Sequence, residues 1–124
     1  MSLYSEKYID NFSKICNESQ FKRNGKSCDS GTFFNFLVEF SKKLSTNNKI
    51  LFYGNGASNS FAEHMALDWS KNGKIMSITL SNNALLTALS NDYSYEDAFR
   101  KHLEMNYKPG DLVVTISSSG NSKN

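Results

Sequence analysis

Cysteine is scarce in this chain of 124 residues, which holds only Cys16 and Cys28. Their spacing matches neither a zinc motif nor a disulfide framework, so we expect two reduced thiols, as is usual for cytosolic proteins. Charge of one sign is scarce as well, since the formal net charge is only +2 and the basic residues form no stripe. The sequence therefore gives little support to a nucleic-acid partner.

Long apolar runs are also lacking. No stretch approaches the length that a membrane-spanning helix needs, and Met1 to Lys7 contains no apolar signal core. Hydrophobic residues still make up 39% of the chain, which is enough for the core of one globular domain. We expect a soluble, cytoplasmic protein with no membrane partner.

The first part of the chain, residues 1–48, has the spacing of two helices. Apolar residues recur at helical intervals over 4–15, and a broader apolar face covers 33–44. The polar stretch between them, 17–31, contains two glycines and is interpreted as a connecting loop. Because such apolar helix faces must be covered, we expect them to pack on the rest of the domain or on a neighbouring subunit.

The second part, residues 49–124, alternates strand and helix patterns. Short apolar runs typical of buried strands alternate with segments of helical periodicity. The strands are expected at 50–53, 74–80 and 112–116, and the helices at 59–71, 83–89 and 95–107. This alternation predicts an α/β fold with a parallel sheet.

A glycine-rich loop, Gly54-Asn55-Gly56-Ala57-Ser58, directly follows the first of these strands. Its glycines allow close backbone approach, and Ser58 stands where a helix N-cap is expected. Taken alone, the motif fits a ligand loop and a simple tight turn equally well. It is no dinucleotide fingerprint, because Asn59 replaces the third glycine, and no P-loop lysine follows.

A serine-rich loop, Ser117-Ser118-Ser119-Gly120-Asn121-Ser122, follows the third strand. Hydroxyls and backbone amides can together bind the oxygens of a phosphate without a cation. Since the carboxyl ends of parallel strands meet at one edge of a sheet, the two loops predict a shared site for a phosphorylated ligand. A flexible serine-rich tail is the alternative interpretation.

Three further groups of residues are candidates. His64 and Asp68 lie one helical turn apart on one face, where they could bind Zn²⁺ or act as an acid–base pair; a surface pair is the alternative. Asn91-Asp92 falls near the carboxyl ends of the strands, although Asn-Asp is also a common turn pair. His102, on another helix, is expected to be exposed to solvent.

Together, the two loops, His64 and Asn91-Asp92-Tyr93 resemble the sugar isomerase (SIS) domain family, and within it the phosphoheptose isomerases. The resemblance covers about Lys49 to Asn124. It implies a flavodoxin-like SIS fold with a parallel sheet flanked by helices, an N-terminal two-helix extension, and a homotetramer with sites between subunits. It also implies aldose–ketose isomerisation of sedoheptulose 7-phosphate, with no organic cofactor.

The same resemblance implies roles for individual residues. His64 would be a zinc ligand, and Asp68 stands where the family has a glutamate that serves as base and metal ligand. The residues expected to contact the sugar phosphate are Asn55, Gly56, Ala57, Ser58, Asn91, Asp92, Ser117, Ser118, Ser119 and Ser122.

Two other functions stay open at this stage. Family members continue with further strands and helices, so we expect the C-terminal strands to be missing here and this chain alone to be inactive. A non-catalytic SIS module is the main alternative, one that binds a sugar phosphate or a protein partner as the DnaA initiator-associating protein does. An unrelated flavodoxin-like nucleotide binder is the other, although the sequence shows no adenine or flavin signature.

Overall fold

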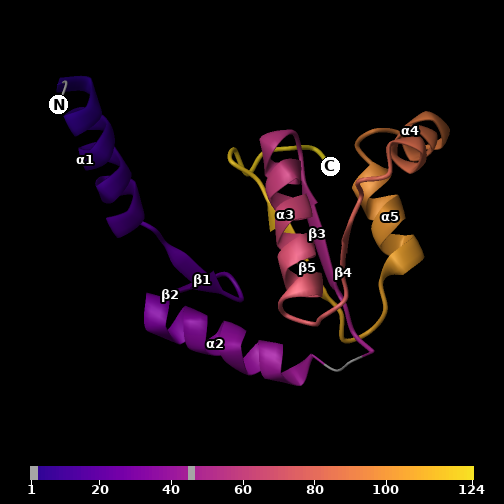
Figure 1. Ribbon diagram of the computed structural model, residues 1–124, viewed down its shortest axis with the longest axis horizontal. Helices are drawn as coiled ribbons and strands as arrows, with labels where there is room; N and C mark the ends of the chain where they lie inside the picture. Colours follow the sequence, from indigo (N-terminus) through magenta and orange to yellow (C-terminus); the bar gives the residue numbers. More distant parts are fainter. Residues whose placement is uncertain (1–2, 45–46) are drawn as a thin grey trace. The chain divides into compact units, whose positions relative to one another are not determined.

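The computed structural model describes residues 3–44 and 47–124, and the chain divides into two compact units (Figure 1). The first unit is Met1–Lys43 and the second is Leu44–Asn124. Within the described residues, no helix has both the length and the apolar character needed to cross a membrane.

The first unit contains two helices and a hairpin: α1 (Leu3–Asn17), β1 (Phe21–Arg23), β2 (Lys26–Cys28) and α2 (Ser30–Lys43). The two strands pair antiparallel, so the prediction that 17–31 is only a connecting loop is wrong. Asn24 and Gly25 form the turn with φ of 51° and 75°. Positive φ at both central residues is the geometry of a two-residue hairpin turn, for which Asn-Gly is the typical sequence.

Aromatic contacts hold the hairpin to α2. The Phe21 ring lies 5.3 Å from that of Phe33, and the Arg23 guanidinium stacks 4.4 Å above the ring of Phe36. By contrast, the apolar residues of α1, such as Phe12 and Ile15, are exposed. The two helices expected from the sequence are therefore present, and the apolar face of α1 is uncovered within its own unit.

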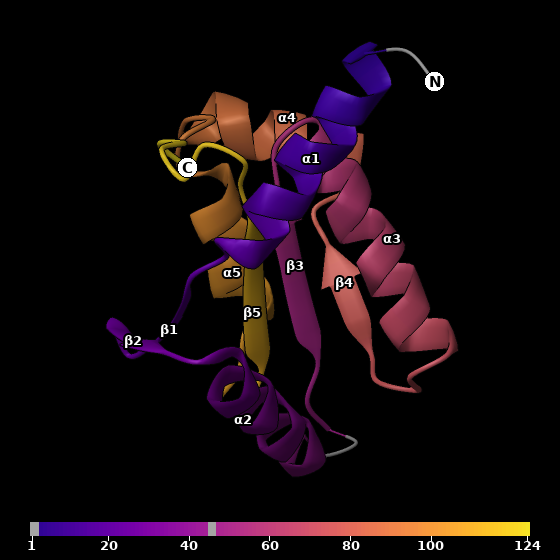
Figure 2. The same ribbon diagram turned by 90° about the vertical axis from the view of Figure 1, so that its left-hand side faces the viewer.

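The second unit is the α/β part of the chain. Its elements are β3 (Ile50–Gly54), α3 (Ala57–Lys71), β4 (Ser77–Thr79), α4 (Asn83–Asp92), α5 (Ala98–Asn106) and β5 (Leu112–Ile116). The strands form a parallel sheet in the order β4-β3-β5, with β3 in the middle (Figure 2). The α/β architecture with a parallel sheet is thus confirmed.

Alternating side chains of β3 supply the core on both faces of the sheet. Leu51 and Tyr53 pack with residues of α4 and α5, whereas Ile50 and Phe52 pack with residues of α3. The helices accordingly cover opposite faces (Figure 1). Because β3 is buried along its whole length, its position fixes where the following loop emerges.

His102 of α5 is buried, which corrects the expectation that it faces solvent. Its Nδ1 atom lies 2.8 Å from the Tyr53 hydroxyl, inside the cluster between the sheet and α5. Burial lowers the pKa of the His102 imidazole and raises the pKa of the Tyr53 hydroxyl. Both side chains are therefore neutral at pH 7 and joined by one hydrogen bond.

This buried imidazole predicts a stability that depends on pH. The pKa of His102 is lower in the folded chain than its ordinary value of 6.5, so the unfolded chain binds the proton more readily. The stabilisation of the folded chain by neutral His102 is fully present above pH 6.5 and decreases as the pH drops below that value. We expect a lower melting temperature at pH 5.5 than at pH 7.5, and a smaller difference in His102→Gln. An equal pH dependence in both proteins would contradict this assignment.

Candidate functional site

The two loops predicted from the sequence emerge side by side at one edge of the sheet. The register pairs Gly54 of β3 with Ile116 of β5, so Asn55 and Ser117 begin their loops next to each other. A small cavity of about 60 Å³ lies between them. Its polar lining comes from Asn55, Thr115, Ser117, Ser122 and Asn124. The predicted meeting of the two loops is confirmed.

The glycine-rich loop turns directly into α3. Gly56 is the N-cap with φ 54° and ψ −124°, a conformation that L-residues rarely adopt. Ser58 is instead the second residue of the helix, so its expected role as N-cap is wrong. No side chain caps the first turn among the described residues. The positive end of a 15-residue helix dipole therefore faces this edge of the sheet.

The serine-rich loop is folded by its own hydroxyls. Ser117 Oγ accepts a hydrogen bond from the Gly120 amide at 2.9 Å, and Ser119 Oγ accepts one from the Asn121 amide at 3.2 Å. A hydroxyl that accepts one bond still has its own proton to donate. Ser118 and Ser122 are exposed, and residues 117–124 form no helix. The donors that this loop offers to an anion are therefore its serine hydroxyls. The amides of Gly120 and Asn121 already donate to serine oxygens within the loop.

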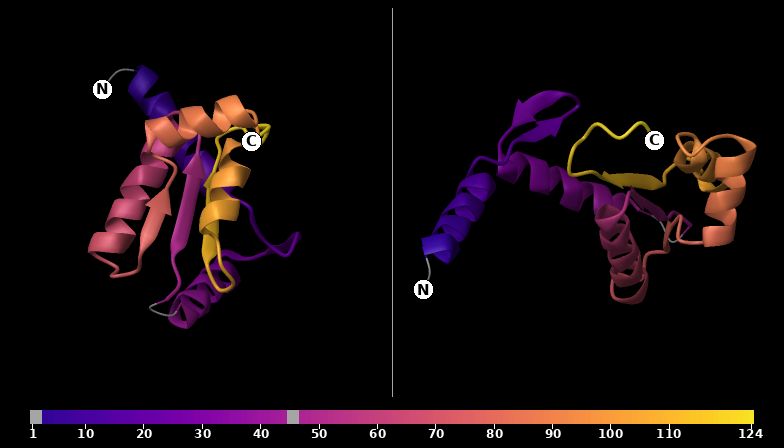
Figure 3. Two further views of the ribbon diagram at one scale, coloured as in Figure 1. Left: turned by 90° about the vertical axis from the view of Figure 1, so that its right-hand side faces the viewer. Right: turned by 90° about the horizontal axis from the view of Figure 1, so that it is seen from above.

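The end of the chain lies beside the turn between α4 and α5 (Figure 3). Asn55 Nδ2 donates to Asn124 Oδ1 at 2.8 Å, and the Lys123 ammonium lies 3.3 Å from the Glu96 carboxylate. The Tyr95 hydroxyl donates to Asn55 Oδ1 at 2.9 Å. Sequence reasoning missed Tyr95, because no motif marks a tyrosine of a turn as the partner of a loop 40 residues earlier.

His64 and Asp68 form the expected i,i+4 pair on α3. His64 Nε2 lies 3.3 Å from Asp68 Oδ2, and Asp68 Oδ1 accepts a hydrogen bond from Asn72. Both side chains are substantially exposed, at 67% and 44%. No hydrogen bond or ion pair of the described chain connects this pair to either loop. The structure thus brings the two candidates together.

The spacing of this pair fits two ligands of a zinc ion, but the number of ligands is too small for a catalytic zinc site. Two ligand atoms about 2.1 Å from a tetrahedral zinc are about 3.4 Å apart, which is close to the observed separation. A catalytic zinc site normally uses three protein ligands. Among residues 3–44 and 47–124, no three His, Cys, Asp or Glu side chains are grouped so that they could hold a metal. The residues described here are therefore insufficient for that site.

Asn91 and Asp92 are the last two residues of α4, and both are exposed. The Asn91 amide donates to the Asp92 carboxylate at 3.1 Å. Helix α4 continues through both residues, so they do not form the turn that their sequence would also allow. No hydrogen bond in the described chain joins them to either loop.

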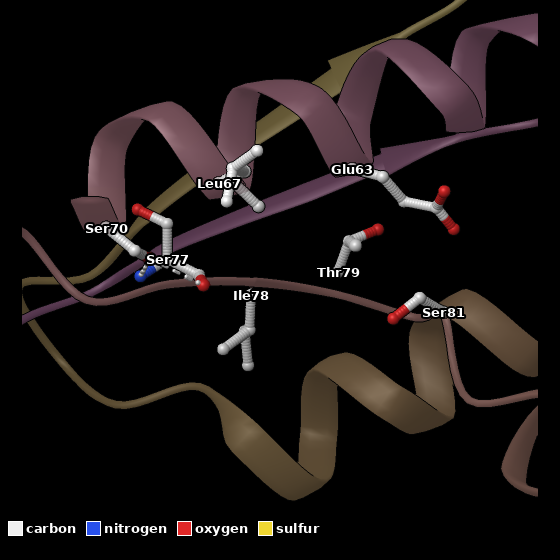
Figure 4. Close-up of a pocket in the computed structure, with 8 residues that line it drawn as sticks. Glu63, Leu67, Ser70, Ser77, Ile78, Thr79 and Ser81 are labelled. Carbon is white, nitrogen blue, oxygen red and sulfur yellow. Dashed lines mark hydrogen bonds between the residues drawn. The ribbon is translucent and has the colours of Figure 1, made fainter. Parts of the chain in front are cut away.

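A second hollow, which sequence reasoning did not find, runs between α3 and the edge strand β4 (Figure 4). It measures about 540 Å³ and includes Glu63, Ser70 and Thr79 in its lining. The Ser70 hydroxyl bonds both the amide and the carbonyl of Ser77, which protects the open edge of β4. Thr79 Oγ1 is buried with no hydrogen-bond partner among the described residues.

Fold and loops together define a parallel α/β protein with a candidate anion site at the carboxyl ends of its strands. The SIS domain model matches residues 39–124. The chain therefore belongs to the SIS domain family.

Named relatives are similar over much of this chain. A probable phosphoheptose isomerase of Thermoplasma acidophilum is 41% identical over 92 aligned positions, and the match covers 69% of this chain and 50% of that protein. A probable phosphoheptose isomerase of Thermoplasma volcanium is 33% identical over 130 aligned positions, gaps included, and the match covers 96% of this chain and 66% of the relative.

A solved structure gives the same result for the fold. The phosphoheptose isomerase GmhA of Neisseria gonorrhoeae matches with a TM-score of 0.65 and 27% identity, over 98% of this chain and 64% of that one. The SIS fold expected from the sequence is confirmed. The chain spans about half the length of several curated relatives that it matches.

Proposed function

We propose that this chain binds a phosphorylated sugar at the edge where β3 and β5 end, as part of a phosphoheptose isomerase. The observation that carries the proposal is the meeting of Asn55 and Ser117 at one small polar cavity, beside the N-terminus of α3. The names of the relatives support the choice of sedoheptulose 7-phosphate as the ligand to test.

Each loop contributes a different kind of donor in this proposal. Ser117, Ser118, Ser119 and Ser122 offer hydroxyl protons to the phosphate, and Ser58 adds a hydroxyl from the first turn of α3. The helix dipole stabilises the negative charge. Asn55, Gly56 and Ala57 line the sugar, together with Asn91 and Asp92 from the end of α4.

Asp68 is the proposed acid–base residue of this chain, with His64 beside it. Aldose–ketose isomerisation moves a proton between neighbouring carbons, and a general base must come within about 2.6–3.2 Å of that proton, directly or through one water. Zinc is proposed only as a metal held by His64 and Asp68 with a further ligand from outside the described residues. A homotetramer, proposed on the family resemblance, would allow a second copy to supply that ligand.

One specific observation favours a second candidate, a SIS module that binds without turnover. The side chain of Asp68 is shorter than the glutamate that the family has at this position. Its carboxylate already contacts His64 and accepts a hydrogen bond from Asn72 at the end of α3. A coupled assay with sedoheptulose 7-phosphate, with and without added Zn²⁺, separates the two candidates. Turnover supports the isomerase, whereas thermal stabilisation by the same sugar without turnover supports the binding module.

Replacing Ser119 by alanine tests the phosphate contact. A hydrogen bond to a charged group contributes about 1.5–3 kcal/mol, so we expect the dissociation constant for sedoheptulose 7-phosphate to rise roughly 10-fold or more. Calorimetric titration measures this change. Ser60→Ala, at an exposed position on α3, is the control and should bind like the unchanged chain. Unaltered binding by Ser119→Ala would show that this serine is not part of the phosphate site.

A further inference from the structure

We propose that Tyr95 is a positioning residue that orients the side-chain amide of Asn55 toward the sugar. This inference rests on the proposed function, because it assigns a task to one side of the same site. Its basis is the hydrogen bond from the Tyr95 hydroxyl to Asn55 Oδ1, at 2.9 Å.

Both ends of the Asn55 amide contact Asn124, and its oxygen has Tyr95 as a second partner. Its oxygen accepts from the Tyr95 hydroxyl, and at a longer 3.3 Å from Asn124 Nδ2. Its nitrogen donates to Asn124 Oδ1 at 2.8 Å, and both asparagines line the small cavity. Because a carbonyl oxygen has two lone pairs, both acceptor contacts are compatible. The Tyr95 hydroxyl thus ties the Asn55 side chain to the turn before α5 and holds its amide where the nitrogen donates to Asn124.

A local turn holds Tyr95 where it can make this contact. Ser94 Oγ accepts from the Asp97 amide at 3.0 Å and donates to the Asp97 carboxylate at 3.2 Å, which closes the turn before α5. Next to Tyr95, the Glu96 carboxylate pairs with Lys123. The same turn therefore contacts both the glycine-rich loop and the segment that follows the serine-rich loop.

The donor that results suits an oxygen of the sugar. In the structure, a carbonyl oxygen of Asn124 occupies the position in front of Asn55 Nδ2. A sugar hydroxyl or carbonyl oxygen is the same kind of acceptor and would replace it when the ligand binds. Without the Tyr95 hydroxyl, the Asn55 side chain loses this anchor, and its amide is held less firmly in the position from which the nitrogen donates. Tyr95 therefore acts on recognition of the sugar, and not on the phosphate.

Tyr95→Phe removes only the hydroxyl of a ring that is 51% exposed, so the fold should be retained. We expect binding of sedoheptulose 7-phosphate to weaken about 5-fold, the effect of one lost hydrogen bond, and binding of inorganic phosphate to stay unchanged. Tyr107→Phe is the matched control, since Tyr107 is similarly exposed at 49% but follows α5 at the other end of the unit. Equal sugar-phosphate affinity in Tyr95→Phe and Tyr107→Phe would overturn the inference.

A double-mutant cycle shows whether Tyr95 acts through Asn55. In the Asn55→Ala background, Tyr95→Phe should cause no further loss of sugar-phosphate affinity. A further 5-fold loss would mean that Tyr95 acts independently, which contradicts a positioning role.

A third measurement does not depend on the ligand. The NMR signals of the Asn55 side-chain amide should shift in Tyr95→Phe and stay in place in Tyr107→Phe. Unmoved signals in Tyr95→Phe would overturn the inference even if the sugar phosphate binds. Shifted signals in a chain that binds no sugar phosphate would support the contact but overturn the proposed function, and the task assigned to Tyr95 with it.

Discussion

Replacing Asp111 by alanine is expected to lower the free energy of unfolding of the α/β unit by about 3–5 kcal/mol. Asp111 is buried directly before β5, where its carboxylate lies 2.6 Å from the ammonium of Lys49, the residue before β3. It also accepts hydrogen bonds from the amides of Lys49, at 2.9 Å, and Lys108, at 3.0 Å. Alanine would leave a buried charge and two amides without their partner, which is the most costly way to break such a pair.

Urea denaturation followed by the fluorescence of Trp69, the only tryptophan, measures this loss within the second unit. Glu104→Ala is the control, because Glu104 pairs with Lys101 at 2.9 Å on the exposed surface of α5. Surface pairs of this kind contribute at most about 1 kcal/mol. Equal losses in the free energy of unfolding would show that the buried Lys49–Asp111 pair stabilises the unit no more than a surface pair does.

The same pair predicts how the unit responds to acid. Burial alone would raise the pKa of Asp111, but the hydrogen bonds from Lys49 and Lys108 outweigh it and lower the pKa to about 2. A carboxyl whose pKa is depressed on folding stabilises the folded state above its ordinary pKa of 3.8. This contribution is lost as the pH falls from there toward 2. Asp111→Ala lacks it at every pH, so the free energy of unfolding should fall less between pH 4 and pH 2 in this variant than in the unchanged chain.

Replacing Gly54 by alanine is the second substitution with a large expected effect. A Cβ atom at this buried position would lie 2.6 Å from the carbonyl carbon and oxygen of Ser58 and 2.9 Å from the Asn59 nitrogen. These are backbone atoms, so only a movement of α3 away from β3 can relieve the overlap. We expect a loss of about 3 kcal/mol in the free energy of unfolding and weaker binding of the sugar phosphate, because Asn55 moves too.

Gly31→Ala is a matched control for this prediction. Its Cβ would meet only the Asp29 side chain, at 3.1 Å, and Gly31 lies in the first turn of α2. Alanine favours helices over glycine, so circular dichroism should show no loss of thermal stability. If Gly54→Ala were as stable as the unchanged chain, this result would contradict the close approach of the α3 backbone to Gly54.

The sequence was informative about the elements that position the site. Strand β5 begins and ends at the residues that its apolar run indicates, and β3 extends only one residue further, to Gly54. Because parallel strands bring their carboxyl ends to one edge, the meeting of the two loops also followed from the pattern. Local periodicity and one rule of topology were sufficient for this much.

Other features depended on contacts that no local pattern encodes. His102 lies among charged neighbours in the sequence, and it is buried where α5 packs on the sheet, with Tyr53 of β3 opposite it. The link between Tyr95 and Asn55 likewise requires the folded sheet. The hairpin of the first unit is different, because its turn does have a local sequence pattern. Asn24-Gly25 is typical of a two-residue hairpin turn, but the polar composition of 17–31 favoured the interpretation as a loop.

The central claim, that the two loops hold a phosphorylated sugar, is tested most directly by calorimetric titration with sedoheptulose 7-phosphate and with unphosphorylated sedoheptulose. We predict saturable binding of the phosphorylated sugar, at least about 10-fold tighter than that of sedoheptulose, since hydrogen bonds to a charged phosphate supply the difference. Equal binding of the two sugars, or no binding of either, would contradict the account.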